Sequence, residues 1–254
     1  MSLPPVGLGT MGIDDPEQIA TALAAGYRHI DTAQIYENQS IVGDGIGKSD
    51  VSRDRVTIAT KLWVDALAAE NVAPAAHNCT DLLGVNALDI LYIHRPRGDY
   101  NPTTTLPEFD ELVNEGVIHK VGVSNFELEE LNQAIDFLET PLSVHQTELH
   151  PLFYRPKLLR HARTHGYTIV AYSPLAGGRV REIDTIVEIA DAHGTTPEAV
   201  TIAWVVAKEP VVTIPKASSE RHIRANLAAP DLSLTTEEID AIDSIEREKE
   251  LYPE

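Results

Sequence analysis

The feature that most constrains the fold is a regular alternation of short apolar segments with longer amphipathic ones along the whole chain. The apolar segments are rich in β-branched residues, are typical of buried strands, and lie at 6–8, 27–30, 56–60, 88–93, 117–123, 143–147, 168–172 and 211–214. The amphipathic segments have helical periodicity and lie at 15–25, 38–47, 70–84, 105–115, 127–139, 155–165, 182–193, 197–208, 219–228 and 235–246. Eight strands that alternate with helices predict an α/β fold, the (β/α)8 TIM barrel. No proline- or glycine-rich linker divides the pattern, so we expect a single barrel domain over residues 1–254.

Several helix starts have a local cause in the sequence. Asp15-Pro16 combines a capping carboxylate with a proline that suits a first helical turn, and Thr196-Pro197 repeats the pattern. The segment 43–47 is rich in glycine, but it lies late in a helical pattern and follows no strand. This argues against a Rossmann dinucleotide-binding domain.

The composition excludes several classes of function. The chain has 39 acidic and 20 basic residues and a formal net charge of −19, so nucleic acid is a poor partner. No apolar stretch reaches the ~18 residues of a membrane span, and the first residues lack the pattern of a secretory signal. The single cysteine, Cys79, is expected to be a small buried side chain. We therefore expect a cytoplasmic protein with an acidic, hydrated surface of the kind that suits a halophilic organism. We also expect a monomer.

Four polar residues fall at the ends of predicted strands. Asp31 and Tyr36 follow the strand at 27–30, Lys61 closes the next, and His94 closes the one after. Because the parallel strands of a barrel end on one face, these side chains should meet in one pocket. Such a set suits proton transfer to a carbonyl, since an ammonium favours ionisation of a nearby phenol. Taken singly, each residue could instead belong to a structural salt bridge or a cap.

Four stretches, in the same order along the chain, resemble signature sequences of the aldo-keto reductase superfamily. They are 26–38 (Gly-Tyr-Arg-His-Ile-Asp-Thr-Ala-Gln-Ile-Tyr-Glu-Asn), 60–63 (Thr-Lys-Leu-Trp), 121–126 (Val-Gly-Val-Ser-Asn-Phe) and 214–216 (Ile-Pro-Lys). The resemblance implies an NAD(P)H-dependent aldehyde or ketone reductase of microbial type, built on a barrel. It makes Tyr36 the general acid and Lys61, held by Asp31, the group that tunes it. His94 would hydrogen-bond the substrate oxygen and orient it, or share the proton.

The resemblance also implies a cofactor site at the other strand ends. The residues that it places along the nicotinamide, ribose and pyrophosphate are Thr10, Asp31, Ser124, Asn125, Gln146, Tyr172, Ser173 and Leu175. Those that it places around the adenosine 2′-phosphate and adenine of NADPH are Lys216, Ser218, Ser219, Arg221, His222 and Asn226. A helix start suits a phosphate on physical grounds as well. Ala217 and His222 depart from the usual serine and arginine, so we expect NADPH to be preferred only modestly, with NADH possible.

On the substrate side, Trp63 and Arg95 are the candidate contacts, and Arg95 could attract an anionic substrate or pair with a local acid. The tail at 249–254 is short, from which we infer an open, shallow pocket. No histidine pair has convincing metal-ligand spacing, and no metal is expected. We interpret the following as surface histidines: His145, His150, His161 and His165.

The predicted function is NADPH-dependent reduction of an aldehyde or ketone, with sugars and small dicarbonyls as candidate substrates. One alternative is a cofactor-binding sensor or auxiliary subunit with little turnover. Another is a barrel isomerase or aldolase that uses Lys61 as a Schiff-base amine. Pairing with Asp31 would keep that amine protonated, which disfavours the last alternative.

Overall fold

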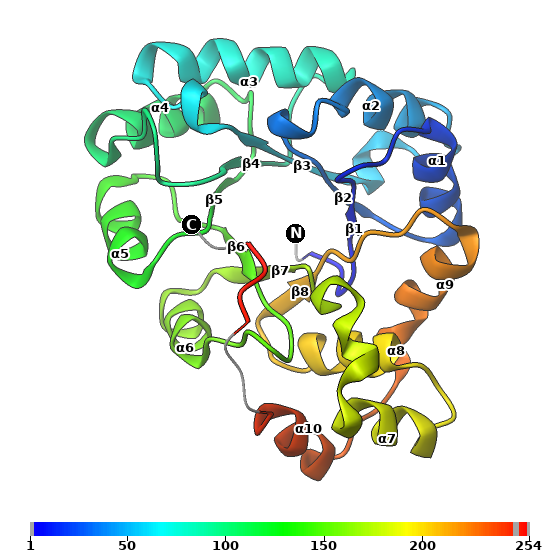
Figure 1. The fold of residues 1–254 in the computed structure, drawn as a ribbon. Coiled ribbons are helices and arrows are strands. Elements are labelled where there is room, and N and C mark those ends of the chain that lie inside the picture. The colour runs from blue at the N-terminus through cyan, green and yellow to red at the C-terminus, as the bar shows by residue number, and fades with distance from the viewer. Residues whose placement is uncertain (1–2, 246–248, 253–254) are drawn as a thin grey trace.

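The centre of the molecule is one eight-stranded parallel sheet, seen in a computed structural model that describes residues 3–245 and 249–252. Its strands, in spatial as in chain order, are β1 (Leu8–Gly9), β2 (His29–Asp31), β3 (Thr57–Leu62), β4 (Ile90–Ile93), β5 (Val121–Ser124), β6 (Val144–Glu148), β7 (Thr168–Tyr172) and β8 (Val211–Thr213). The sheet closes on itself, because Val6 bridges Thr213 and Gly9 bridges Lys216 in parallel. The predicted (β/α)8 barrel is therefore confirmed (Figure 1).

Helices form a ring outside the strands, as Figure 1 shows along the barrel axis. They are α1 (Pro16–Ala25), α2 (Gln39–Gly47), α3 (Ala69–Leu83), α4 (Pro102–Asn114), α5 (Leu128–Phe137), α6 (Pro156–His165), α7 (Asp184–Ala192), α8 (Pro197–Val206), α9 (Glu220–Ala228) and α10 (Thr236–Asp243). Short 3₁₀ turns lie between helices and strands at η1 (Gln34–Tyr36), η2 (Arg53–Arg55), η3 (Val64–Ala66) and η4 (Ala176–Glu182), and η5 (Ala229–Asp231) lies between α9 and α10.

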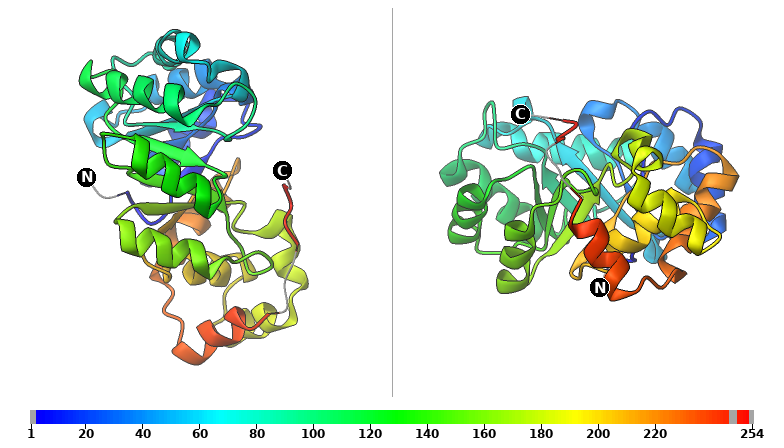
Figure 2. Two further views of the ribbon diagram at one scale, coloured as in Figure 1. Left: turned by 90° about the vertical axis from the view of Figure 1, so that its left-hand side faces the viewer. Right: turned by 60° about the horizontal axis from the view of Figure 1, so that its bottom comes forward.

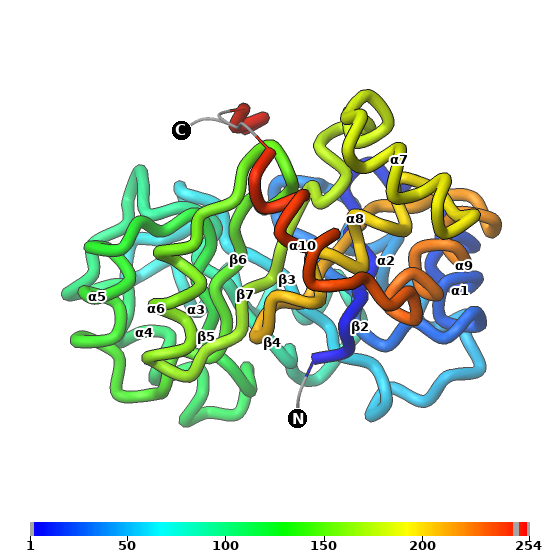
Figure 3. The backbone as a smooth tube through the Cα atoms, turned by 90° about the horizontal axis from the view of Figure 1, so that it is seen from below, coloured from blue at the N-terminus to red at the C-terminus, as the bar shows by residue number. Residues whose placement is uncertain are grey.

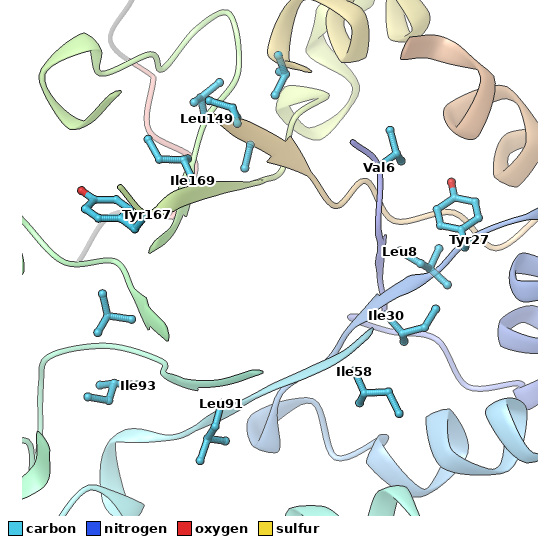
Figure 4. Packing of buried hydrophobic residues seen from close by; sticks show 14 of the residues in the cluster. Val6, Leu8, Tyr27, Ile30, Ile58, Leu91, Ile93, Leu149, Tyr167 and Ile169 are labelled. Carbon is cyan, nitrogen blue, oxygen red and sulfur yellow. The ribbon is translucent and has the colours of Figure 1, made fainter. Parts of the chain in front are cut away.

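The strands are buried on both faces, which explains why they read as continuous apolar runs. Side chains such as Leu8, Ile30 and Ile58 point outward from the strands and pack toward the helices (Figure 4). A second, smaller cluster contains alternate residues of the same strands, Ala59, Ile90, Tyr92, Val144, Val170 and Val212, together with Ile214. These two layers hold each strand end in a fixed place around the barrel mouth.

The expected helix starts are present with their caps. The Asp15 side chain accepts the Glu17 N–H at 2.9 Å, and the Thr196 hydroxyl accepts from Ala199. The glycines of α2 permit close packing rather than a phosphate loop. A Cβ on Gly45 would lie 2.5 Å from the Ile19 Cβ, so α2 can pack against α1 only with glycine there.

The structure differs from the sequence-based expectation at several boundaries. β5 begins at Val121 rather than at residue 117, because the N–H groups of Val117 and Ile118 both donate back to the Leu112 carbonyl and close α4. α4 begins at Pro102 rather than at residue 105, because Asn101 caps it through the Thr103 N–H at 3.0 Å. The second of these signals, an asparagine before a proline, is visible in the sequence.

Two of the four supposed surface histidines are completely buried, so that interpretation was wrong for them. His145 lies on β6 and His150 just after it, and both are 0% exposed. β6 is covered by the barrel interior on one side and by helices on the other, so a polar side chain on it cannot reach solvent. His161 is half-buried and His165 exposed on α6, where their rings stack at 4.2 Å.

The two ends of the barrel are distinct. Figures 2 and 3 show the first described residues at one end and residues 249–252 at the other. Among the residues that the structure describes, no helix is both long and apolar enough to cross a bilayer.

Candidate active site

A pocket of about 440 Å³ opens at the carboxyl ends of the strands. Its walls come from loops after nearly every strand, which is where barrel enzymes hold their reactive groups. The predicted site residues that line it are Thr10, Asp31, Tyr36, Trp63, His94, Arg95, Ser124, Asn125, Gln146, Tyr172, Ser173, Leu175 and Lys216. The fold thus brings together residues that are far apart in the sequence.

Lys61 and Asp31 form an ion pair beside the pocket. Their side chains are 0% and 1% exposed. The Lys61 ammonium also donates to the Thr32 carbonyl at 2.7 Å, and the Gln146 amide donates to the second Asp31 oxygen at 2.8 Å. Burial disfavours the charge on Lys61, but its interaction with the Asp31 carboxylate, supported by Tyr36, outweighs burial and raises the pKa of the ammonium. Lys61 is therefore a buried group that is protonated near pH 7.

Tyr36 ends the η1 turn, which follows β2. The turn is fixed to β3 because the Gln34 side-chain oxygen accepts the Trp63 N–H at 2.9 Å. The Lys61 Nζ lies 5.3 Å from the centre of the Tyr36 ring. Burial raises the pKa of Tyr36 above its usual value, and the Lys61 charge only partly opposes that rise. The sequence argument considered the charge but could not include the burial.

His94 follows β4 directly, and its ring lies between two aromatic neighbours. The Trp63 and Tyr36 rings approach it edge-on, with centroids at 4.9 and 6.1 Å. Burial, with smaller effects from the Lys61 and Arg95 charges, lowers the pKa of His94 to about 2. The imidazole is therefore neutral near pH 7. It can donate a hydrogen bond, but it cannot serve as a cationic acid.

Polar groups from β5, β6 and β7 form a connected set on the other side of the pocket. The Tyr172 hydroxyl donates to the Asn125 side-chain oxygen at 2.9 Å, and the Asn125 amide donates to the Ser124 hydroxyl at 3.2 Å. Asn125 and Ser173 both have left-handed backbones, with φ of 60° and 49°. Such strain in residues other than glycine is typical of functional sites.

The predicted phosphate-binding residues are only partly brought to the pocket. Lys216 lines its edge, whereas Ser218, Ser219, Arg221 and His222 are exposed around the start of α9, outside the pocket wall. The Ser219 hydroxyl caps that helix by accepting the His222 N–H at 3.3 Å. Asn226 is buried on α9 and also lies outside the pocket wall.

Residues 5–247, which include all eight strands of the barrel, match the aldo/keto reductase family. The chain belongs to the aldo/keto reductase family. It is an oxidoreductase of that family.

Several reductases are similar over nine-tenths or more of their own length. A 9,11-endoperoxide prostaglandin H2 reductase of Trypanosoma cruzi is 35% identical, over 98% of this chain and 90% of its own. A methylglyoxal reductase of Salmonella typhi is 33% identical, over 97% of this chain and 94% of its own. Among solved structures, an aldo-keto reductase from a Medee basin deep-sea metagenome library has a TM-score of 0.95 at 30% identity, covering 100% of this chain and 95% of that one.

Several residues that line the pocket of this aldo/keto reductase were missed by the sequence reasoning, and among them are three with large side chains. Met11 and Ile35 are 52% and 44% exposed and line the pocket, and Tyr252 from the C-terminal tail lines it as well. The tail, although short, therefore contributes a side chain to the pocket wall. An apolar pair, Leu251-Tyr252, in an otherwise charged tail was the available signal. Among the described residues, no group of three or more metal-ligating side chains comes together.

Proposed function

We propose that this aldo/keto reductase reduces an aldehyde or ketone to the alcohol with NADPH, with Tyr36 as the proton donor. The observation that carries the proposal is the approach of the Tyr36 and His94 rings, 6.1 Å apart, in a pocket beside the buried Lys61–Asp31 pair. Carbonyl reduction needs a hydride at carbon and a proton at oxygen. The family generally uses NAD(P)H, and a bound nicotinamide would supply the hydride.

The chemistry of the pocket residues fits such a cofactor. Hydroxyl and amide groups of Ser124, Asn125 and Gln146 gather on one side, and Tyr172 adds an aromatic ring held by its bond to Asn125. These residues would hold a carboxamide and its ring. The cation of Lys216 lies at the edge of the same pocket, where a phosphate would be stabilised.

The proton would come from the Tyr36 hydroxyl. Because burial raises its pKa, the phenol is protonated at neutral pH and is available as a donor. Lys61 limits the rise, so the phenolate that remains after donation is stabilised by a charge 5.3 Å from its ring. The phenolate then recovers a proton from water. The neutral His94 imidazole would donate a hydrogen bond to the substrate oxygen and orient it.

Lys61 is poorly suited to the alternative role of a Schiff-base amine. Its side chain is 0% exposed, and its ammonium is occupied by Asp31 and by the Thr32 carbonyl. The raised pKa keeps it protonated and therefore not nucleophilic. These observations favour the tuning role over an aldolase or isomerase mechanism.

We place small dicarbonyls first among the substrate candidates, because a methylglyoxal reductase is among the relatives. The apolar side chains at the pocket mouth, Met11, Ile35 and Trp63, would also accommodate an aromatic aldehyde.

The test is the loss of NADPH absorbance with methylglyoxal, an aromatic aldehyde and an aldose in parallel. We expect turnover with at least one of them, with the alcohol as product. Tight NADPH binding without turnover on any carbonyl would contradict the proposal and favour a cofactor-binding sensor.

A further inference from the structure

A buried carboxylate on the barrel is bonded to the backbone of the C-terminal tail. Glu148 ends β6 and is 3% exposed. Its Oε1 accepts the Leu251 N–H at 2.8 Å, and its Oε2 accepts the Tyr252 N–H at 3.2 Å. The His150 Nε2 lies 2.7 Å from Oε1. Both carboxylate oxygens thus have partners, although the tail is more than 100 residues away in the sequence.

The bonded segment is in turn attached to the mouth of the pocket. The Lys249 N–H donates to the Leu152 carbonyl at 3.1 Å, and Leu251 packs against the main hydrophobic core. The Tyr252 ring meets the Tyr172 ring edge-on at 5.9 Å and lines the pocket. Figure 1 shows the tail, in red, crossing the barrel near the ends of β6 and β7.

The energetic balance favours a specific role for Glu148. A buried carboxylate is costly unless hydrogen bonds compensate for its lost hydration. Hydrogen bonds from backbone N–H groups to a carboxylate are roughly twice as strong as neutral ones. Residues 249–252 belong to no helix or strand, so contacts with the barrel hold them, and these two bonds are among those contacts. The N–H groups of the tail supply the hydrogen bonds that the buried carboxylate needs, and the same bonds hold the tail in place.

We propose that Glu148, supported by His150, is a positioning residue that latches residues 249–252 across the pocket mouth and so makes Tyr252 a wall of the substrate site. The chemistry does not pass through Glu148. Its effect on substrates rests on the proposed reductase function, whereas its effect on the tail does not.

Amide hydrogen exchange of Leu251 and Tyr252 tests the latch directly. In the parent protein, both amides should exchange at least tenfold more slowly than in an unstructured peptide. Glu148→Gln keeps the shape but replaces one acceptor oxygen with a donor, and should speed exchange of these amides at least tenfold. Amides of β4 should be unchanged, which shows that the barrel is intact.

Asp110→Asn is the matched control. Asp110 is also buried, and its carboxylate also accepts two successive backbone N–H groups, from Glu139 and Thr140, but it lies on α4 away from the pocket. It should leave exchange at Leu251 and Tyr252 at the parent rate. If Glu148→Gln fails to fold, Leu251→Pro removes one donor from the tail itself and should expose the Tyr252 amide in the same way.

Kinetics with a bulky aromatic aldehyde then test the consequence. Tyr252→Ala and Glu148→Gln should each raise KM at least fivefold, and the double variant should be no worse than either one, because both remove the same wall. Equal exchange rates in the parent and in Glu148→Gln, or additive effects on KM, would overturn the proposal. If the parent protein shows no turnover, the proposed reductase function is wrong. The hydrogen-exchange result still tests whether Glu148 holds the tail.

Discussion

Lys61 and Asp31 are paired where neither side chain reaches solvent, and the Gln146 amide binds the carboxylate oxygen that Lys61 leaves available. The pair is both a structural and an electrostatic element. It stabilises the ends of β2 and β3 against each other, and it places a positive charge next to the Tyr36 ring.

Lys61→Met should destabilise the fold by about 3–5 kcal/mol, because it leaves the Asp31 charge buried with only neutral partners. Lys61→Met combined with Asp31→Asn should recover part of that loss, since no unpaired charge remains. Urea unfolding of the parent, the single variant and the double variant measures both effects. A double variant less stable than Lys61→Met would contradict this view of the pair.

Three buried histidines should make the protein less stable in acid. Burial lowers the pKa of His29 to about 4, of His145 to about 3 and of His94 to about 2. Each stays neutral in the folded state, while the unfolded chain takes up a proton below pH ~6.5. The free energy of unfolding is therefore not reduced by these histidines above pH ~6.5. It decreases as the pH falls from there toward the folded pKa of each ring.

Between pH 7 and pH 5, each of these histidines should reduce the free energy of unfolding by about 2 kcal/mol. His145→Gln removes one of them away from the pocket, so the difference in stability between the two pH values should shrink by about that amount. Urea unfolding at both pH values gives the comparison. An unchanged pH dependence in His145→Gln would show that His145 is protonated in the folded state.

Salt should stabilise the protein. The net charge of −19 repels itself in the folded state, and the Debye length falls from about 10 Å at 0.1 M to about 3 Å at 1 M salt. We expect the midpoint of thermal unfolding to rise steadily with KCl. The same series with sucrose separates screening from a general solute effect. A flat or falling midpoint in KCl would show that repulsion between the acidic residues does not limit the stability of the fold.

NADPH should be preferred over NADH, mainly through Lys216. Lys216→Ala should weaken NADPH binding roughly tenfold, as expected for loss of a charge-assisted bond of about 1.5 kcal/mol, and should leave NADH binding nearly unchanged. Arg224→Ala is the control, because Arg224 is exposed on α9 but paired with Glu220. Fluorescence titration with both cofactors measures the effect. Equal losses for the two cofactors would show that Lys216 does not distinguish the 2′-phosphate.

The barrel could be predicted because its strands are buried on both faces and therefore stand out as apolar runs between helical patterns. The position of Asp31, Tyr36, Lys61 and His94 followed from that, since parallel strands end on one face. Side chains within strands were harder to interpret. His145 is polar and yet completely buried, because both faces of β6 are covered.

Two features of the site could not be derived from the sequence. The apolar pair Leu251-Tyr252 stands out in the sequence, but its partner does not, because the Tyr252 N–H donates to Glu148 in a distant part of the chain. The pKa of Tyr36 is raised because burial outweighs the Lys61 charge, and the extent of burial depends on how the η1 turn packs. Both depend on tertiary structure rather than on residue type.

The most direct test of the proposed mechanism is Tyr36→Phe, which removes only the hydroxyl that is expected to donate the proton. Loss of a general acid lowers turnover by about 10²–10⁴-fold, so kcat should fall by at least a hundredfold while the NADPH dissociation constant stays within twofold of the parent. Tyr100→Phe is the matched control, because the Tyr100 hydroxyl is buried and has no hydrogen-bond partner in the described part of the chain. It should retain full turnover. If Tyr36→Phe turns over within tenfold of the parent, Tyr36 is not the proton donor.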